Sequence, residues 1–190
     1  MADNRHSGPC QSGRMKTTWL NSNPPKSIVF LSLLFAGMVL TAQPISNRLI
    51  DYPAFQKIVA DSAAERESHR LTERQFLQAM ADTNTVLLDA RTAAKYELRH
   101  IQGAVNLQFT DFTADTLAKV IPTKGTKILI YCNNNFLGSP VSFASKAAPA
   151  SLNISTYTAL RTYGYTNIFE LGPLLDVRST VIPFEGTEIK

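Results

Sequence analysis

Cysteine and histidine are scarce in this chain of 190 residues. It contains two cysteines, Cys10 and Cys132, and three histidines, none of them spaced as the ligands of a zinc site are. We therefore predict neither a bound metal nor a cofactor. Internal repeats and low-complexity tracts are also lacking, and 44% of the residues are apolar. The composition therefore predicts a folded domain with a hydrophobic core rather than a disordered chain.

An excess of one charge is lacking as well, once the N-terminus is set aside. The whole chain carries a formal charge of +4, but residues 1–42 hold four basic residues and one acidic residue. The remainder has 15 basic and 14 acidic residues, so the basic character belongs mainly to the N-terminus. We therefore predict no nucleic-acid partner.

Residues 27–42 form a charge-free apolar run, preceded by the basic residues Arg14, Lys16 and Lys26. A membrane-spanning helix needs about 20 apolar residues, so this 16-residue run better suits a signal peptide. We expect an exported, periplasmic protein. The alternative is an uncleaved inner-membrane anchor formed by residues 27–42, which would be the only membrane contact.

Three regions follow from this pattern: a leader at 1–42, a lead-in segment at 43–70 and a domain at 71–190. Cys10 falls in the leader, so the exported part holds Cys132 alone and cannot form an internal disulfide. In an oxidising compartment a lone thiol is buried and inert, paired with another chain, or reactive. The sequence leaves these three alternatives open.

Helical and strand patterns alternate along the domain. Helices are expected at 52–60, 73–80, 92–98, 115–120 and 155–163, and short apolar strands at 85–89, 103–107, 126–131 and 166–171. This alternation predicts an α/β fold with a central, mostly parallel sheet flanked by helices. Functional sites in such sheets lie at the carboxyl ends of the strands, and Cys132 directly follows one strand.

Four segments, in order and with fitting gaps, resemble the rhodanese family of sulfurtransferase-type domains. They are Leu87–Arg91, His100–Leu107, Ile128–Cys132 and Gly164–Ile168. The resemblance covers about residues 70–173 and implies the rhodanese-like three-layer fold.

The resemblance also implies a chemistry for Cys132, which occupies the position of the family's catalytic cysteine. Its thiolate would take a sulfur atom from a sulfane-sulfur donor, and the resulting persulfide would pass that atom to a thiol or cyanide-type acceptor. Asp89, Arg91 and His100 would be structural supports of this site rather than its chemical groups.

The sequence departs from the family after Cys132. Residues 133–151 separate the cysteine from the expected start of the next helix, where the family uses a few residues, and they contain no arginine to hold an anionic donor. Thiosulfate specificity is therefore in doubt. The loop residues Asn133, Asn134, Asn135, Phe136 and Gly138 predict an enlarged, neutral cradle over the thiol, because asparagine and glycine accept left-handed backbone angles.

Two other functions compete with sulfur transfer. The chain can be a non-catalytic binding module that uses the loop at 133–151 for a protein partner, since long loops in compact domains are often functional. Relatives of this fold also hydrolyse phosphoesters, but that chemistry requires a loop arginine for the charge of the transition state. Its absence disfavours a phosphatase.

Overall fold

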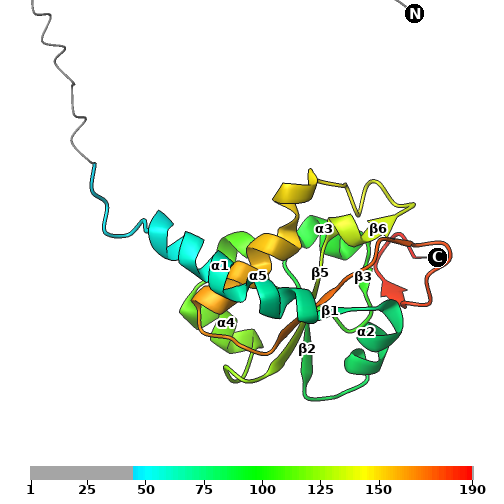
Figure 1. Ribbon diagram of the computed structural model, residues 1–190. Helices are drawn as coiled ribbons and strands as arrows, with labels where there is room; N and C mark the ends of the chain where they lie inside the picture. The colour runs from blue at the N-terminus through cyan, green and yellow to red at the C-terminus, as the bar shows by residue number, and fades with distance from the viewer. Residues whose placement is uncertain (1–44, 190) are drawn as a thin grey trace, which may run out of the picture. The chain divides into compact units, whose positions relative to one another are not determined.

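The computed structural model describes residues 45–189 (Figure 1). The predicted leader at 1–42 lies outside the described residues. None of the helices within 45–189 combines the length and hydrophobicity that a membrane crossing requires.

A five-stranded parallel sheet forms the centre, in the order β1-β7-β5-β2-β4. Its strands are β1 (Arg70–Leu71), β2 (Thr85–Asp89), β4 (Val105–Asn106), β5 (Lys127–Tyr131) and β7 (Ile168–Leu171). Helices cover the sheet, so the predicted α/β class is confirmed.

The two central strands explain why the sheet has a core on each face. β2 and β5 pair along all five residues, and neighbouring side chains on a strand point to opposite faces. Leu87 and Leu129 belong to one buried cluster, whereas Leu88 and Ile130 belong to the other. Strands buried on both faces read as continuous apolar runs, which is the pattern seen in the sequence.

The helices are placed by their caps and apolar faces. They are α1 (Tyr52–Ser68), α2 (Glu73–Met80), α3 (Ala93–Leu98), α4 (Ala114–Val120) and α5 (Leu152–Thr162). Thr72 and Thr113 start α2 and α4 through capping boxes. α4 and α5 pack on one face of the sheet, and α2 packs on the other.

The lead-in helix is longer than predicted. The expected helix at 52–60 continues through the charged residues to Ser68, because this second half packs against α5 (Figure 1). Ser62 is buried there, and Arg161 of α5 lies 3.2 Å from Glu65. α1 and β1 therefore belong to the same compact unit as the rest of the domain.

The C-terminal segment forms strands that the sequence did not predict. β8 (Leu175–Asp176) pairs with β6 (Phe136–Leu137) in parallel, and β9 (Phe184–Glu185) pairs with β3 (His100–Ile101) in antiparallel fashion. These strands are two residues long and leave no periodic signal. They attach the C-terminus to the loop at 133–151 and to the segment after α3.

Candidate functional site

β5 delivers Cys132 to the carboxyl edge of the sheet. The cysteine is 1% exposed, and Asn133–Asn135 form a short 3-10 helix directly after it. The Asn135 amide N–H donates to the Cys132 carbonyl at 3.1 Å, and the Cys132 N–H donates to Asn135 Oδ1 at 2.9 Å. This reciprocal pair fixes the backbone around the thiol.

A chain of side-chain amides continues from this turn to α5. Asn135 Nδ2 donates to the Leu171 carbonyl at 2.7 Å, so its Oδ1 must be the acceptor that faces Cys132. Asn153 Nδ2 donates to the same Oδ1 at 3.1 Å. Asn153 Oδ1 is buried and has no hydrogen-bond partner among the described residues. Asn135 thus ties the cysteine to β7 and to α5 at once.

The first two asparagines anchor the rest of the long loop. Asn133 Nδ2 donates to the Ala144 carbonyl at 2.8 Å. Asn134 forms a two-point contact with Lys146, donating to its carbonyl at 2.8 Å and accepting from its N–H at 2.9 Å. These side chains hold the loop on the short turn after Cys132.

Phe136 and Gly138 lie away from the thiol. Phe136 is 1% exposed and packs against Phe143 in the core, 4.6 Å between ring centroids. Gly138 has a φ of 86°, and a Cβ there would lie 2.8 Å from Asp176 Oδ1. Of the five predicted loop residues, only Asn134 and Asn135 line a pocket together with Cys132.

That pocket, the Cys132 pocket, has a volume of about 330 Å³. Ser151 and Asn153 form one wall, at the start of α5. Ser151 is the N-cap of α5, yet its hydroxyl makes no capping bond and lies 3.4 Å from Cys132 Sγ. The positive end of the α5 dipole is therefore directed at the region of the thiol, where it favours a negative sulfur.

Another part of the pocket wall carries charge. Arg66 from α1, Arg70 from β1 and Glu170 from β7 all line the Cys132 pocket. Arg66 Nη2 lies 2.7 Å from Glu170 Oε1, and Arg70 Nε lies 3.4 Å from the same oxygen. Glu170 is 1% exposed, and its burial raises the pKa of its carboxyl above the ordinary value although both arginines act in the opposite direction.

Sequence reasoning missed these residues for identifiable reasons. Arg66 precedes the segment that resembles the family, and Arg70, at the start of that segment, meets Glu170 through the β1–β7 pairing across 100 residues. No local pattern predicts that pairing. Ser151 could have been predicted from the sequence, because a serine directly before a helix that starts at Leu152 is a natural N-cap.

Asp89 and Arg91 lie at the end of β2 and are sealed inside the protein. Their side chains are 0% and 1% exposed, and Arg91 Nε lies 2.9 Å from Asp89 Oδ1. Arg91 Nη1 donates to the Ser142 carbonyl at 3.0 Å, and Nη2 donates to the Arg99 carbonyl at 2.8 Å. These contacts join the sheet to two loops and favour the predicted supporting role, which stays a prediction.

His100 is placed apart from the Cys132 pocket. Its ring stacks on Tyr96 at 3.7 Å between centroids, and its Nδ1 lies 2.7 Å from the Tyr96 carbonyl oxygen. Its Nε2 lies 3.5 Å from a carboxylate oxygen of Glu185 in β9. These contacts are those of a residue that holds α3 to the C-terminal segment. Within the described residues, no cluster of potential metal ligands occurs.

Comparisons with known proteins give one family match and several similar structures. The family model of the rhodanese-like domain matches residues 72–173. Among solved structures, the chain is similar to the Alr3790 protein of Anabaena sp. (18% identity, 61% of this chain and 91% of that chain, TM-score 0.44). It is similar to BH2092 of Bacillus halodurans (16% identity, 70% and 88%, TM-score 0.46). It is also similar to a rhodanese from E. coli solved with anions (21% identity, 54% and 98%, TM-score 0.37). No curated protein matches the chain.

Proposed function

Since the chain belongs to the family of rhodanese-like domains, we propose that it carries or transfers sulfane sulfur through a persulfide on Cys132. The observation that carries the proposal is the position of Cys132 Sγ. It lies on the wall of a pocket, 3.4 Å from the Ser151 hydroxyl and at the N-terminal end of α5. A hydroxyl donor and a helix N-terminus both favour a thiolate over a neutral thiol.

The proposed reaction is a pair of displacements at sulfur. In the first, the Cys132 thiolate attacks the outer sulfur of the donor, forming an Sγ–S bond while the donor's own bond to that sulfur breaks. The leaving group departs with the electron pair, as sulfite does from thiosulfate. In the second, a thiolate or cyanide acceptor attacks the outer sulfur, the Sγ–S bond breaks, and the Cys132 thiolate returns. No external oxidant or reductant is needed.

The direct test is thiocyanate formation from thiosulfate and cyanide, with Cys132→Ser as the matched variant. We expect activity in the wild type and a fall to the uncatalysed background in Cys132→Ser, because a hydroxyl cannot form the persulfide. Equal activity in the two proteins contradicts thiosulfate:cyanide sulfurtransfer.

A test that does not depend on thiosulfate as the donor addresses the carrier function. After exposure to inorganic polysulfide, peptide mass mapping is expected to show one added sulfur atom on Cys132 that a thiol reductant removes. Mapping by peptide separates this site from Cys10. The absence of the added sulfur on Cys132 overturns the persulfide proposal as a whole.

A binding module without catalysis is the second candidate. The long loop leaves Leu137 and Val141 48% and 57% exposed, which would suit an apolar contact with a protein partner. The two candidates predict different reactivity of the Cys132 thiol. If Cys132 in the native protein resists small alkylating reagents, the binding module is favoured. Rapid alkylation favours the sulfur carrier.

The location belongs to the proposal as well. The basic residues and the apolar run at 27–42 support export to the periplasm by a cleaved signal peptide, with an inner-membrane anchor as the alternative. N-terminal sequencing of protein from cell fractions distinguishes the two. A periplasmic form that starts near residue 43 supports cleavage, an intact form in the membrane fraction supports the anchor, and a cytoplasmic intact form contradicts export.

A further inference from the structure

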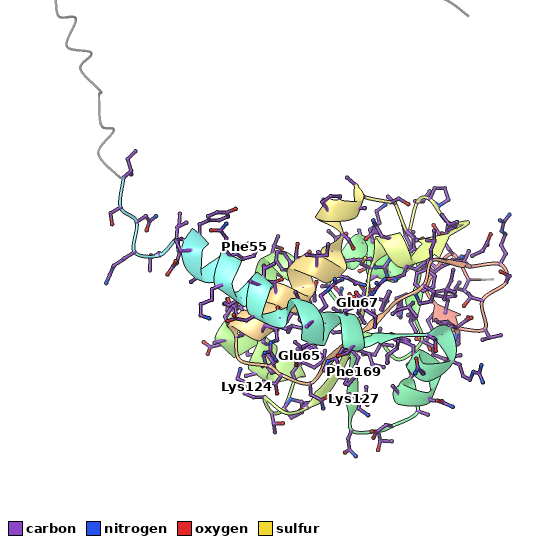
Figure 2. All side chains as sticks on the ribbon, viewed as in Figure 1. Phe55, Glu65, Glu67, Lys124, Lys127 and Phe169 are labelled. Carbon is purple, nitrogen blue, oxygen red and sulfur yellow. The ribbon has the colours of Figure 1, made fainter. Side chains whose placement is uncertain are left out.

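The two arginines in the wall of the Cys132 pocket come from outside the region that the family model matches, whereas Glu170 lies inside it. Arg66 lies in the last turn of α1, and Arg70 is the first residue of β1. The family match starts after both of them, at residue 72. Figure 2 labels Glu65 and Glu67, which flank Arg66 near the end of α1, on the half of the helix away from Phe55. The loop after Cys132 has no arginine, and its one basic residue, Lys146, does not line the Cys132 pocket, so these two arginines are the basic groups of that pocket.

The formal charge of the pocket is positive. Among the described residues that line it, Arg66 and Arg70 are basic and Glu170 is acidic, which leaves one net positive charge. Glu170 is held between the two arginines and is buried, so it is not free to meet a ligand. The arginine side chains are 28% and 41% exposed, so both reach solvent at the pocket.

The arginine donors at this wall are partly engaged. Arg66 Nε has no hydrogen-bond partner among the described residues, but it is buried, so a ligand reaches it only after the side chain moves. Arg70 Nη2 donates to the Gly172 carbonyl at 3.3 Å. Arg70 contacts Glu67 at 3.2 Å, but Glu67 is 71% exposed, and exposed ion pairs exchange partners at little cost. A guanidinium suits a planar or tetrahedral oxyanion, because its donors form a fixed fork.

We propose that Arg66 and Arg70 are the specificity-determining residues of this site and select a sulfur donor with an anionic end, with Glu170 setting their orientation. This inference rests on the proposed function of Cys132. It also revises the expectation of a neutral pocket that came from the asparagines after the cysteine, because charge enters from the lead-in segment. The lead-in is then part of the active site rather than a spacer.

The test compares alkylation of Cys132 by iodoacetate, an anion, and iodoacetamide, its neutral counterpart, in the full chain. Peptide mapping follows Cys132 separately from Cys10. The ratio of the two rate constants cancels changes in the intrinsic reactivity of the thiol and reports attraction of the anion. It is measured in Arg70→Gln, Arg66→Gln, Glu170→Gln and the double variant Arg70→Gln/Glu170→Gln.

We expect the ratio to follow the formal charge of the pocket. It should fall about threefold in Arg70→Gln and in Arg66→Gln, rise about threefold in Glu170→Gln, and return near the wild-type value in the double variant, as expected for single charges near a partly exposed site. Added salt should reduce the differences in this ratio between the variants, because it screens the charges. Arg74→Gln is the matched control, because Arg74 is exposed on α2 and does not line the pocket. An unchanged ratio in both arginine variants overturns the proposal.

A second measurement does not depend on a reactive thiol. In a Cys132→Ser background, calorimetry measures thiosulfate binding with and without Arg70→Gln. We expect affinity to fall about tenfold, the effect of removing one charge-assisted contact. If Cys132 reacts with neither alkylating reagent, the proposed persulfide chemistry fails while this measurement still decides the inference. Equal thiosulfate affinity in the two proteins, or no binding in either, overturns the inference.

Discussion

The same three-residue motif folds twice in this protein, once in the core and once at the surface. Asp89 is the last residue of β2 and Arg91 lies two residues on; Asp176 is the last residue of β8 and Arg178 lies two residues on. In both, the arginine N–H donates to the aspartate Oδ1 at 2.9 Å, and the arginine Nε donates to the same oxygen at 2.9 Å and 2.8 Å respectively. The local geometry is therefore the same at the two places.

What differs is the surroundings. The Asp89 and Arg91 side chains are 0% and 1% exposed, whereas those of Asp176 and Arg178 are 28% and 76% exposed. Arg91 has further acceptors in two loops, and the Tyr131 hydroxyl donates to Asp89; burial raises the pKa of that tyrosine well above its ordinary value. Arg178 is paired with Asp176, and the hydrogen bonds that Arg178 donates lower the pKa of the Asp176 carboxyl to about 2. A motif of this kind predicts a local turn, but its contribution to the free energy of unfolding depends on the residues that the fold places around it.

The largest expected effect separates these two motifs. Arg91→Gln leaves the Asp89 carboxylate buried without its partner, so we expect the free energy of unfolding to fall by about 3–5 kcal/mol. Arg178→Gln is the matched control, and it should change stability little because Arg178 is 76% exposed and Asp176 keeps contact with water. Urea unfolding of both variants measures the difference. Equal losses of unfolding free energy in the two variants would mean that burial does not determine how much the motif stabilises the protein.

A smaller effect is expected at Glu170, which is buried like Asp89 but is paired with arginines whose side chains are 28% and 41% exposed. Its pKa is raised in the folded protein, chiefly by burial and against the opposing effect of Arg66. A raised folded pKa means that the fold favours the protonated carboxyl, so this contribution is complete below the unfolded pKa and is lost as pH rises through the folded value.

The stability of the wild type relative to Glu170→Gln should therefore fall as pH rises from about 4, where an unperturbed glutamate begins to ionise. Urea unfolding of both proteins across the pH range measures this difference. A relative stability that instead grows with pH would show that the ion pairs with Arg66 and Arg70 outweigh burial.

The smallest expected effect concerns the attachment of the long loop to the C-terminus. Ser142 and Ser139 donate to Glu188 Oε2 at 2.5 Å and 3.0 Å, and the Ser142 contact is the main cause that lowers the Glu188 pKa. Glu188→Gln should cost at most about 1 kcal/mol and increase proteolysis within 137–151. In the wild type the contribution is present at neutral pH and is lost as pH falls through the lowered pKa. Unchanged cleavage in that loop would show that Glu188 does not hold it.

The sheet and the position of Cys132 could be predicted because they depend on local patterns. β2 and β5 are apolar runs with both faces buried, and Cys132 follows β5 directly in the sequence. The end of α5 near Gly164 was also predicted from the residues, whereas its start near Leu152 followed from the family resemblance and the residues alone predicted a start at Ser155. A strand, a turn and a cysteine within a few residues give a signal that needs no knowledge of distant partners.

The charged half of the pocket could not be predicted in the same way. Arg70 reaches Glu170 through a strand of two residues, and Arg66 reaches it from a helix whose second half looks solvated in the sequence. The C-terminal strands β8 and β9 are equally short. Contacts of this kind are selected by three-dimensional packing between segments about 100 residues apart, and no short window of sequence contains them.

Two-residue strands also close both sides of the central sheet. β1 lies at one edge and β4 at the other, and each offers too few unpaired backbone groups to template the strand of a second molecule. Without residues 45–71, the four-residue strand β7 would become an edge, and its mostly buried, apolar side chains would flank an open row of backbone groups. We therefore expect the segment that supplies arginines to the pocket to limit aggregation as well, and a fragment that begins at residue 72 to self-associate more than the full chain.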